Sequence, residues 1–267
     1  RERADEEEDI FVTNEEAMLL KDKSAMLIVV DVNVPAMTEC PELLKSISTI
    51  VVLDHHRQSN ETIKNAVVSY VEPYASSTCE MVAEILQYIV DKPKLKNIEA
   101  DAMYSGILVD TDNFVIKAGV RTFEAAAYLR RAGADVTRVR KMFREDMEHC
   151  RIRTAIINKA EIYMDEFAIS TFDGENVSGA TVVGAKAANA LLNIQGIRGS
   201  FVLTALQDCI YVSARSIDEL NVQVIMEKFG GGGHLTMAAA QLKDVSLSDA
   251  AEMLKHTLRK MHEDGDI

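Results

Sequence analysis

The sequence predicts an α/β protein, in which a parallel-sheet domain is joined by a helical connector to a smaller α+β domain. The first half alternates short apolar runs, rich in β-branched residues, with amphipathic segments, as parallel strands and crossover helices do. The second half mixes alternating strands with amphipathic helices. The chain has 267 residues, 48% of them hydrophobic, which is enough for two cores. We therefore expect two domains.

The first domain is expected at residues 1–146 and contains four apolar segments and three helices. The strand candidates are 26–32, 48–54, 66–72 and 103–111, and the last could equally be a buried helix. The helix candidates are 76–90, 121–132 and 135–146. Ser76 or Ser77 and Asp135 can cap the first and third of these helices, and Gly133 can end the second.

The connector is expected at 147–162, where the helical pattern continues to about residue 160. The second domain, at 163–267, begins with period-two alternation in "AEIYMDEFAIS". Two further strands are predicted by "SFVLTAL" and "CIYVSAR". Its helices are predicted by "GAKAANALLNI", "SIDELNVQVIMEKF" and "SLSDAAEMLKHTLRKMHE".

Composition excludes several classes of function. The formal net charge of -13 argues against binding to duplex nucleic acid, because such proteins carry a basic stripe that neutralises phosphates. The four cysteines form no C-x-x-C pair, so neither a zinc ribbon nor a disulfide framework is expected. No apolar run approaches the roughly 20 residues that span a bilayer. We expect a cytoplasmic segment without membrane contact.

Three acids follow apolar runs. Asp31 ends "LIVVD", Asp54 ends "IVVLD" and Asp110 ends "GILVD". Because the carboxyl ends of parallel strands line one crevice, these acids can converge although they are far apart in sequence. A divalent cation is the simplest compensation for their mutual repulsion. His55 and His56 add imidazoles, and a mixed carboxylate and imidazole set suits Mn, Fe or Mg.

A single Asp after a strand is more often a turn former or a helix cap than a ligand. We prefer that interpretation for Asp112, on a loop two residues after Asp110. Two adjacent histidines after a buried strand are costly to leave unpaired, so Asp54, His55 and His56 together favour function.

The second domain carries "KFGGGGHLTMAAA", in which Gly230 to Gly233 precede His234. Consecutive glycines are tolerated where backbone approaches something closely, or where amides form an anion-binding nest, so we expect a phosphate contact. A flexible linker is the alternative, but linkers are richer in polar residues. Arg215 in "VSARS" offers a guanidinium beside the hydroxyls of Ser213 and Ser216.

The motifs "LDHHR", "VVDVNVP", "GILVDTDNF" and "GGGGH" together resemble the DHH phosphoesterase family with its DHH-associated C-terminal domain. Within that family, "EPYASST", "GVRTFEAAAYLRRAGAD" and "SARSIDELNVQVIMEKFGGGGH" are most similar to the membrane-anchored cyclic-di-AMP phosphodiesterases. The likeness covers nearly the whole chain, with the motifs in the family's order.

The resemblance implies a role for each matching residue. Asp31 would bridge two metals, His55 and Asp110 would be further metal ligands, and His56 would contact the scissile phosphate. Asp54 would orient the histidine pair. The nucleotide would be held from the second domain by Ser213, Arg215, Gly231, Gly232, Gly233 and His234.

The chain departs from the family's pattern in one place. A His-x-x-x-Asp-x-Asp motif is expected before Asp31 and is absent. We therefore expect an N-terminally truncated fragment, which binds at most one Mn²⁺ instead of the two of the complete protein and hydrolyses little by itself. The parent protein would be membrane-anchored, with this region in the cytosol.

The resemblance implies hydrolysis of cyclic-di-AMP to linear 5′-pApA in bacterial signalling, by a homodimer. Two alternatives stay open. The same chemistry would support a nanoRNase, exonuclease or bisphosphate-nucleotide phosphatase. The incomplete metal set would also suit a nucleotide-binding module without catalysis.

Overall fold

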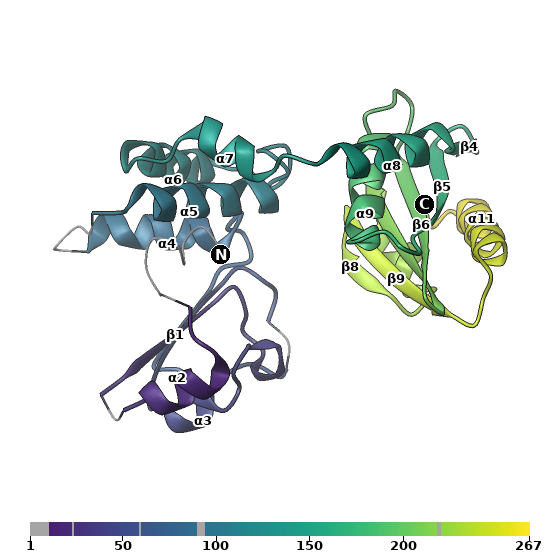
Figure 1. The fold of residues 1–267 in the computed structure, drawn as a ribbon. Coiled ribbons are helices and arrows are strands. Elements are labelled where there is room, and N and C mark those ends of the chain that lie inside the picture. The colour runs from purple at the N-terminus through teal and green to yellow at the C-terminus, as the bar shows by residue number, and fades with distance from the viewer. Residues whose placement is uncertain (1–10, 23, 59, 90–93, 218–219) are drawn as a thin grey trace. The chain divides into compact units, whose positions relative to one another are not determined.

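The computed structural model describes residues 11–22, 24–58, 60–89, 94–217 and 220–267 (Figure 1). The chain divides into two compact units, Arg1–Arg144 and Glu145–Ile267. Parts of three predicted segments lie outside the described residues. They are the charged segment 1–10, residue 90 of the helix expected at 76–90, and residues 218–219 of the helix expected in "SIDELNVQVIMEKF". The predicted fold class is confirmed: a parallel three-stranded sheet lies in the first unit and a mixed sheet in the second.

The first unit joins a small parallel sheet to a layer of helices (Figure 1). The strands, in the order β1-β2-β3, are β1 (Met26–Val30), β2 (Thr49–Asp54) and β3 (Val68–Val71). The short helices α2 (Asn14–Leu20), η1 (Pro35–Met37) and α3 (Leu43–Ser46) lie near the sheet, and the helical layer contains α4 (Thr78–Tyr88), α5 (Asn97–Asp110), α6 (Val120–Arg131) and α7 (Val136–Met142).

Two hydrophobic clusters hold this unit together. One covers a face of the sheet, where Val29, Ile50 and Val52 pack with Leu44 of α3 and with Ile63. The other lies between the helices and consists of Ala83, Ala100, Tyr104, Ile107, Ala125, Ala126, Leu129, Ala134 and Val139. The helical layer thus has its own core beside the carboxyl ends of the strands.

Residues 103–110 are part of helix α5 and Thr111 is its C-cap, so the interpretation of segment 103–111 as a strand was wrong and the alternative of a buried helix was right. Ala100, Tyr104 and Ile107 recur at helical spacing, and their buried face packs between α4 and α6. A run of apolar residues bounded by Gly106 and Asp110 could not distinguish the two. Asp110 is consequently the last residue of a helix.

The helix expected at 135–146 ends early, at Met142, and α8 (Met147–Asn158) begins separately. Asp146 interrupts the helix because its side chain accepts a hydrogen bond from the backbone N–H of His149, which makes Asp146 an N-cap. The ring of His149 contacts the Asp146 carboxylate through Nδ1 and the Ser178 carbonyl through Nε2, at 2.9 Å. These acceptors, the Ser178 carbonyl first, raise the pKa of His149.

The second unit is a six-stranded sheet of order β4-β5-β6-β7-β9-β8, in which only β5 and β6 are parallel. The strands are β4 (Glu161–Tyr163), β5 (Phe167–Asp173), β6 (Gly199–Leu206), β7 (Cys209–Ser216), β8 (Gly232–His234) and β9 (Met237–Lys243). The single alternating segment 160–170 is a β4–β5 hairpin, whose turn includes Met164 and Asp165 at positive φ.

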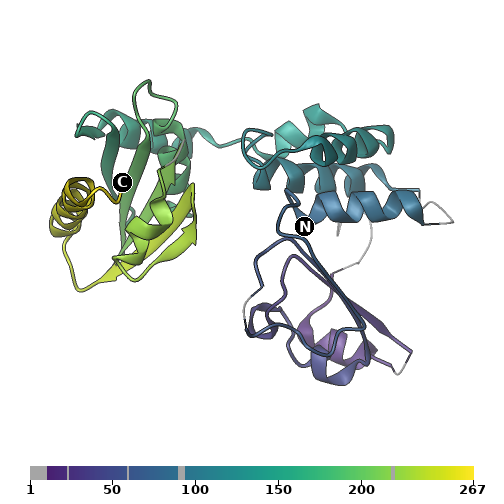
Figure 2. The same ribbon diagram turned by 180° about the vertical axis from the view of Figure 1, so that it is seen from behind.

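Helices cover both faces of this sheet. On one face, Ile156 of α8 and the α9 helix (Ala180–Leu191) pack against Ala168 and Val202 (Figure 1). On the other, α10 (Val222–Glu227) and α11 (Leu247–Asp264) cover Phe201 and its neighbours, and the rear view shows α10 in front of the sheet (Figure 2). Helix α8, which lies in the predicted connector, therefore contributes to the core of this unit. The predicted domain limits stay a prediction.

Candidate metal and phosphoester site

Asp31 follows β1 in a left-handed backbone conformation, with φ of 64°. Its backbone N–H donates to the Leu53 carbonyl at 3.0 Å, so the β1–β2 ladder fixes this residue's position. An Asp tolerates this conformation better than most residues, yet the conformation still costs free energy and is typical of functional sites. The Thr78 hydroxyl donates to Asp31 Oδ1 at 2.9 Å and orients the carboxylate.

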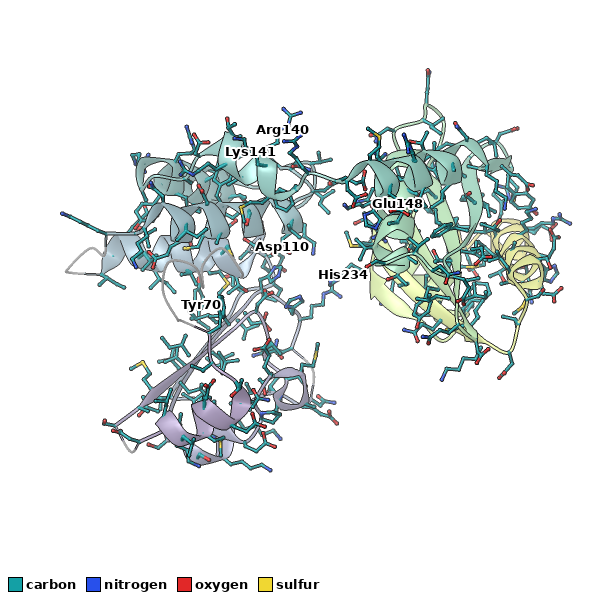
Figure 3. All side chains as sticks on the ribbon, viewed as in Figure 1. Tyr70, Asp110, Arg140, Lys141, Glu148 and His234 are labelled. Carbon is teal, nitrogen blue, oxygen red and sulfur yellow. The ribbon has the colours of Figure 1, made fainter. Side chains whose placement is uncertain are left out.

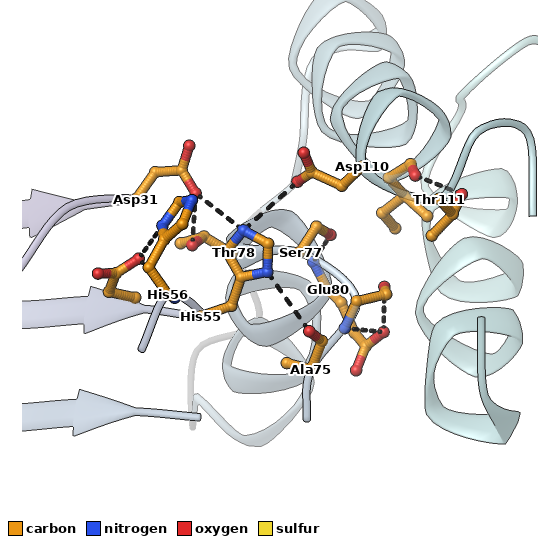
Figure 4. A network of polar contacts seen from close by, with 12 residues as sticks. Asp31, His55, His56, Ala75, Ser77, Thr78, Glu80, Asp110 and Thr111 are labelled. Atoms are coloured by element: carbon orange, nitrogen blue, oxygen red, sulfur yellow. Dashed lines mark hydrogen bonds and ion pairs between the residues drawn. The ribbon is translucent and has the colours of Figure 1, made fainter. Parts of the chain in front are cut away.

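His55 is the side chain on which two acids converge (Figure 4). Its Nε2 lies 3.5 Å from Asp31 Oδ1 and 3.8 Å from Asp110 Oδ2. Its Nδ1 lies 3.4 Å from the Ala75 carbonyl oxygen. A neutral ring with its proton on Nδ1 donates to that carbonyl and leaves the Nε2 lone pair for a cation, as metal-binding histidines require. The imidazole is almost buried, with 8% of the side chain exposed.

Asp54 is fully buried and holds His56. Asp54 Oδ1 lies 2.7 Å from His56 Nδ1 and accepts the backbone N–H of His56 at 3.1 Å. The Asn33 amide donates to Asp54 Oδ2 at 2.5 Å, which fixes the other carboxylate oxygen. The His56 side chain is about half exposed, so its ring is fixed on one side and accessible on the other.

The predicted ligands come from three elements of the first unit. Asp31 follows β1, His55 follows β2 and Asp110 ends α5, from which its side chain points toward the strands (Figures 3 and 4). The structure places Asp31 and Asp110 each beside His55 Nε2. In the described part of the chain, the ligand atoms that lie within 4.8 Å of one another are those of Asp31, His55 and His56, a group that does not include Asp110. Thr78 and Asn33, which orient the carboxylates, were not anticipated from the sequence.

The donor set fits a divalent cation. Ligand atoms around one such ion are separated by about 3.0–3.5 Å, and Asp31 Oδ1 and Asp110 Oδ2 lie 3.5 and 3.8 Å from His55 Nε2, so each carboxylate needs only a small shift to share an ion with His55. Burial raises the pKa of Asp110, and Asp31 raises it further, against the opposing effect of His55. A cation beside these carboxylates would offset both the cost of burying the Asp110 charge and the repulsion between Asp110 and Asp31.

A cavity of about 490 Å³ opens beside Asp31 and Asp110. Its wall is mainly apolar and contains Val30, Thr78, Cys79, Val82, Ala102, Met103, Ser105, Gly106 and Val109. Burial, with smaller contributions from Asp110 and Asp31, raises the pKa of the Cys79 thiol to about 11. Cys79 therefore stays protonated at neutral pH and is a poor metal ligand, which leaves carboxylates and imidazoles as the ligand set.

A buried carboxylate supports the segment behind His55. Glu80 (Figure 4) accepts hydrogen bonds at Oε2 from the Ser76 backbone N–H at 3.3 Å and from the Ser76 hydroxyl. The same oxygen accepts a hydrogen bond from the Thr122 hydroxyl at 2.7 Å. Ser77 caps α4 by accepting the backbone N–H of Glu80 at 3.0 Å. This network ties residues 76–80 to α6 and so fixes the adjacent Ala75 carbonyl that contacts His55.

The predicted nucleotide-binding residues lie in the second unit. Arg215 donates through Nε to Asn189 Oδ1 at 2.6 Å, and His234 is at the end of β8 (Figure 3). The amides of Gly230 and Gly231 donate to carbonyls of Glu227 and Met226, which closes α10. These two amides are therefore occupied, and the expected nest of four consecutive amides does not form.

Close backbone approach explains two of the glycines instead. A Cβ on Gly231 would lie 2.1 Å from the Ala239 carbonyl oxygen, and one on Gly233 would lie 2.4 Å from that of Met237. Both glycines let β8 pair with β9. Their contact with substrate stays a prediction.

Two family models match the chain: the DHH family N-terminal domain at residues 4–107 and the DHHA1 domain at residues 167–263. The chain contains a DHH domain followed by a DHHA1 domain. The resemblance given by "LDHHR" and "GGGGH" is thereby confirmed.

Two curated relatives are cyclic-di-AMP phosphodiesterases by name. PdeA of Listeria monocytogenes is 45% identical over 91% of this chain and 37% of its own length. GdpP of Bacillus subtilis is 41% identical over 96% of this chain and 39% of its own length. The DHH–DHHA1 chain thus spans less than two fifths of either relative.

A solved structure shares the fold. An exopolyphosphatase-related protein from Bacteroides fragilis superposes with a TM-score of 0.75, at 20% identity, over 88% of this chain and 71% of its own. Among the described residues, no helix combines the length and apolar character needed to cross a membrane.

Proposed function

We propose that this DHH–DHHA1 chain is part of a metal-dependent phosphodiesterase that converts cyclic-di-AMP to linear 5′-pApA. The observation that carries the proposal is the approach of two carboxylates, Asp31 and Asp110, to the same His55 nitrogen beside a cavity. The names of the relatives that are 41% and 45% identical support the choice of substrate.

Asp31, His55 and Asp110 would hold Mn²⁺, with His55 kept in the required tautomer by the Ala75 carbonyl. The bound cation would polarise a phosphoryl oxygen and lower the pKa of its water. The carboxylates alone would repel a phosphodiester, so charge compensation at this point is needed before substrate can approach.

His56 is the group suited to contact the scissile phosphate. Its Nδ1 is engaged by the buried Asp54, which fixes the ring and directs Nε2 outward. A polar group fixed in this way can contact the phosphoryl oxygens on which charge grows during attack. In the DHHA1 domain, Arg215 and His234 would bind a phosphate of the nucleotide, and Ser213 would contribute a hydroxyl group.

The test is Mn²⁺-dependent conversion of cyclic-di-AMP to 5′-pApA, followed by chromatography, in this chain and in its natural protein. We expect turnover in the natural protein, little turnover in the 267-residue chain, and at most one bound Mn²⁺ in that chain. His56→Gln in the natural protein should reduce turnover by about 100-fold or more. Unchanged cyclic-di-AMP after incubation of the natural protein with Mn²⁺ would contradict the proposal.

A further inference from the structure

The α9 face of the second sheet carries polar side chains on β7 and β9. In β7 the buried residues Ile210, Val212 and Ala214 face α10 and α11, so Tyr211, Ser213 and Arg215 point to the opposite face. In β9 the alternation is the same, and Gln241 shares that outer face with Ala239 and Met237.

Strand register arranges these side chains in three rows. Ser213 is opposite Ala239, which is opposite Gly232, so the middle row contains only small residues. Tyr211 and Gln241 form the row on one side. Arg215, Met237 and His234 form the row on the other side. Adjacent rows are two residues apart along each strand, which is about 7 Å.

A cavity of about 340 Å³ lies over the small row and the Tyr211–Gln241 row. Its lining residues are Thr181, Tyr211, Val212, Ser213, Gly230, Gly231, Ala239, Ala240 and Gln241. The space is open above the neighbouring Gly232, because an added Cβ there would meet no atom within 4 Å. The volume is within the range of small-molecule sites.

The chemistry of this cavity suits an uncharged polar ligand. None of its lining residues carries a charge, whereas Arg215 and His234 lie in the row on the far side of the small residues. Within the described part of the chain, the Tyr211 hydroxyl, the Ser213 hydroxyl and the Gln241 amide form no hydrogen bonds with protein groups. They are therefore available to a ligand, as the polar groups of a recognition site must be.

We propose that this cavity binds the adenine base of the nucleotide, with its phosphate directed toward Arg215. The inference rests on the proposed function, since it assigns a base-recognition site to the same substrate. A glutamine amide presents one donor and one acceptor, which match the N6 and N7 positions of adenine and not the two acceptors of guanine. The Tyr211 ring supplies an aromatic surface against which a base can pack. Gln241 and Tyr211 are specificity-determining residues.

The experiment is calorimetric titration of the 267-residue chain with AMP and with GMP in the presence of EDTA. The chelator removes divalent cations from the Asp31 site, so the titration reports the DHHA1 domain. Gln241→Leu removes the amide and leaves an apolar side chain of similar volume. Gln223→Leu makes the same change on α10, outside the cavity, and serves as the matched control.

We expect Gln241→Leu to weaken AMP binding about tenfold and to abolish the preference for AMP over GMP. Gln223→Leu should change neither. Tyr211→Ala should weaken the binding of both AMP and GMP. Tyr211→Phe should retain most of the affinity if the ring is the main contact. Circular dichroism on each variant verifies that the sheet is intact.

Equal AMP affinity in the parent chain and in Gln241→Leu would overturn the inference, and so would parallel losses in Gln241→Leu and Gln223→Leu. Either result would leave the proposed function standing if the natural protein hydrolyses cyclic-di-AMP. The opposite outcome is also informative. If Gln241→Leu loses AMP binding but the natural protein shows no Mn²⁺-dependent hydrolysis, the proposed base site stands and the proposed phosphodiesterase function is refuted.

Discussion

Replacing Glu80 tests whether the network behind His55 positions the metal site. All three hydrogen bonds to this carboxylate end on Oε2, while Oε1 lies 4.0 Å from Arg121 Nε. The amide oxygen of Glu80→Gln can therefore keep the three donors, and we expect a loss of about 1–2 kcal/mol from the missing charge. Glu80→Ala leaves the donors of Ser76 and Thr122 unpaired and should cost about 3–5 kcal/mol.

The functional effect should follow the same order. Because Glu80 holds residue 76 next to the Ala75 carbonyl, its loss frees the His55 ring, and Mn²⁺ affinity should fall about tenfold or more in Glu80→Ala. In Glu80→Gln the affinity should stay within about threefold of the parent value. Chemical denaturation gives the free energies of unfolding, and calorimetric titration gives the Mn²⁺ affinities.

Asp101→Asn is the matched control for this prediction. Asp101 is fully buried on α5, and both of its oxygens are used, one by Arg138 Nε and the other by the Asp135 N–H and Arg138 Nη2. The substitution should destabilise the same unit without changing Mn²⁺ affinity. If Asp101→Asn and Glu80→Ala weaken Mn²⁺ binding equally, the effect reflects lost stability, and the positioning role of Glu80 is refuted.

Three further predictions concern single positions. Gly231→Ala should destabilise the second unit by about 2 kcal/mol because its Cβ would lie 2.1 Å from a β9 carbonyl oxygen. The control is Gly232→Ala, whose Cβ would meet no atom within 4 Å. In denaturant titrations, this control should change the free energy of unfolding by less than about 0.5 kcal/mol. Asp31→Ala should be about 1 kcal/mol less stable than Asp31→Gly, because φ is 64°; equal melting would contradict that backbone geometry. The raised pKa of His149 means that its stabilising contribution is full below the unfolded value of about 6.5 and is lost as pH rises through the folded value. His149→Gln should therefore remove part of the decrease in melting temperature between about pH 5.5 and pH 8.5, and an unchanged profile would refute the assignment.

From the sequence, the proximity of the site residues could be predicted more accurately than the secondary structure on which each of them lies. Asp31 and His55 follow adjacent parallel strands, and parallel strands place their carboxyl ends together, so proximity could be inferred without coordinates. Asp110 converges for a different reason, because it ends a helix packed beside the sheet. An apolar run does not distinguish a short strand from one face of a buried helix.

Residues that orient the ligands could not be predicted. Thr78, Asn33 and Glu80 are single polar residues whose partners come from other elements, 21 to 47 positions away. No local pattern marks such a residue, because its role depends on tertiary contacts. The segment "EPYASST" came closest to an indication, since it contains Ser77, the cap of α4, and ends at Thr78.

The glycine run shows how one composition permits two physical explanations. Consecutive glycines can form an anion nest or permit close strand approach, and the sequence alone does not separate these outcomes. In the structure, Gly230 and Gly231 close α10, and Gly231 and Gly233 also accommodate β9. The pairing of β8 with β9 decides which explanation applies, and this pairing cannot be inferred from the glycine run itself.

The central claim is that Asp31, His55 and Asp110 share one cation. The most direct test is the Mn²⁺ dissociation constant of the 267-residue chain, measured by titration with electron paramagnetic resonance detection, and compared with Asp31→Asn, His55→Gln and Asp110→Asn. Asp112→Asn, a change of the same kind two residues from Asp110, is the control. We predict a loss of at least tenfold for each of the three and none for the control. Binding that is unchanged in the three variants, or weakened as much by Asp112→Asn, would contradict the account.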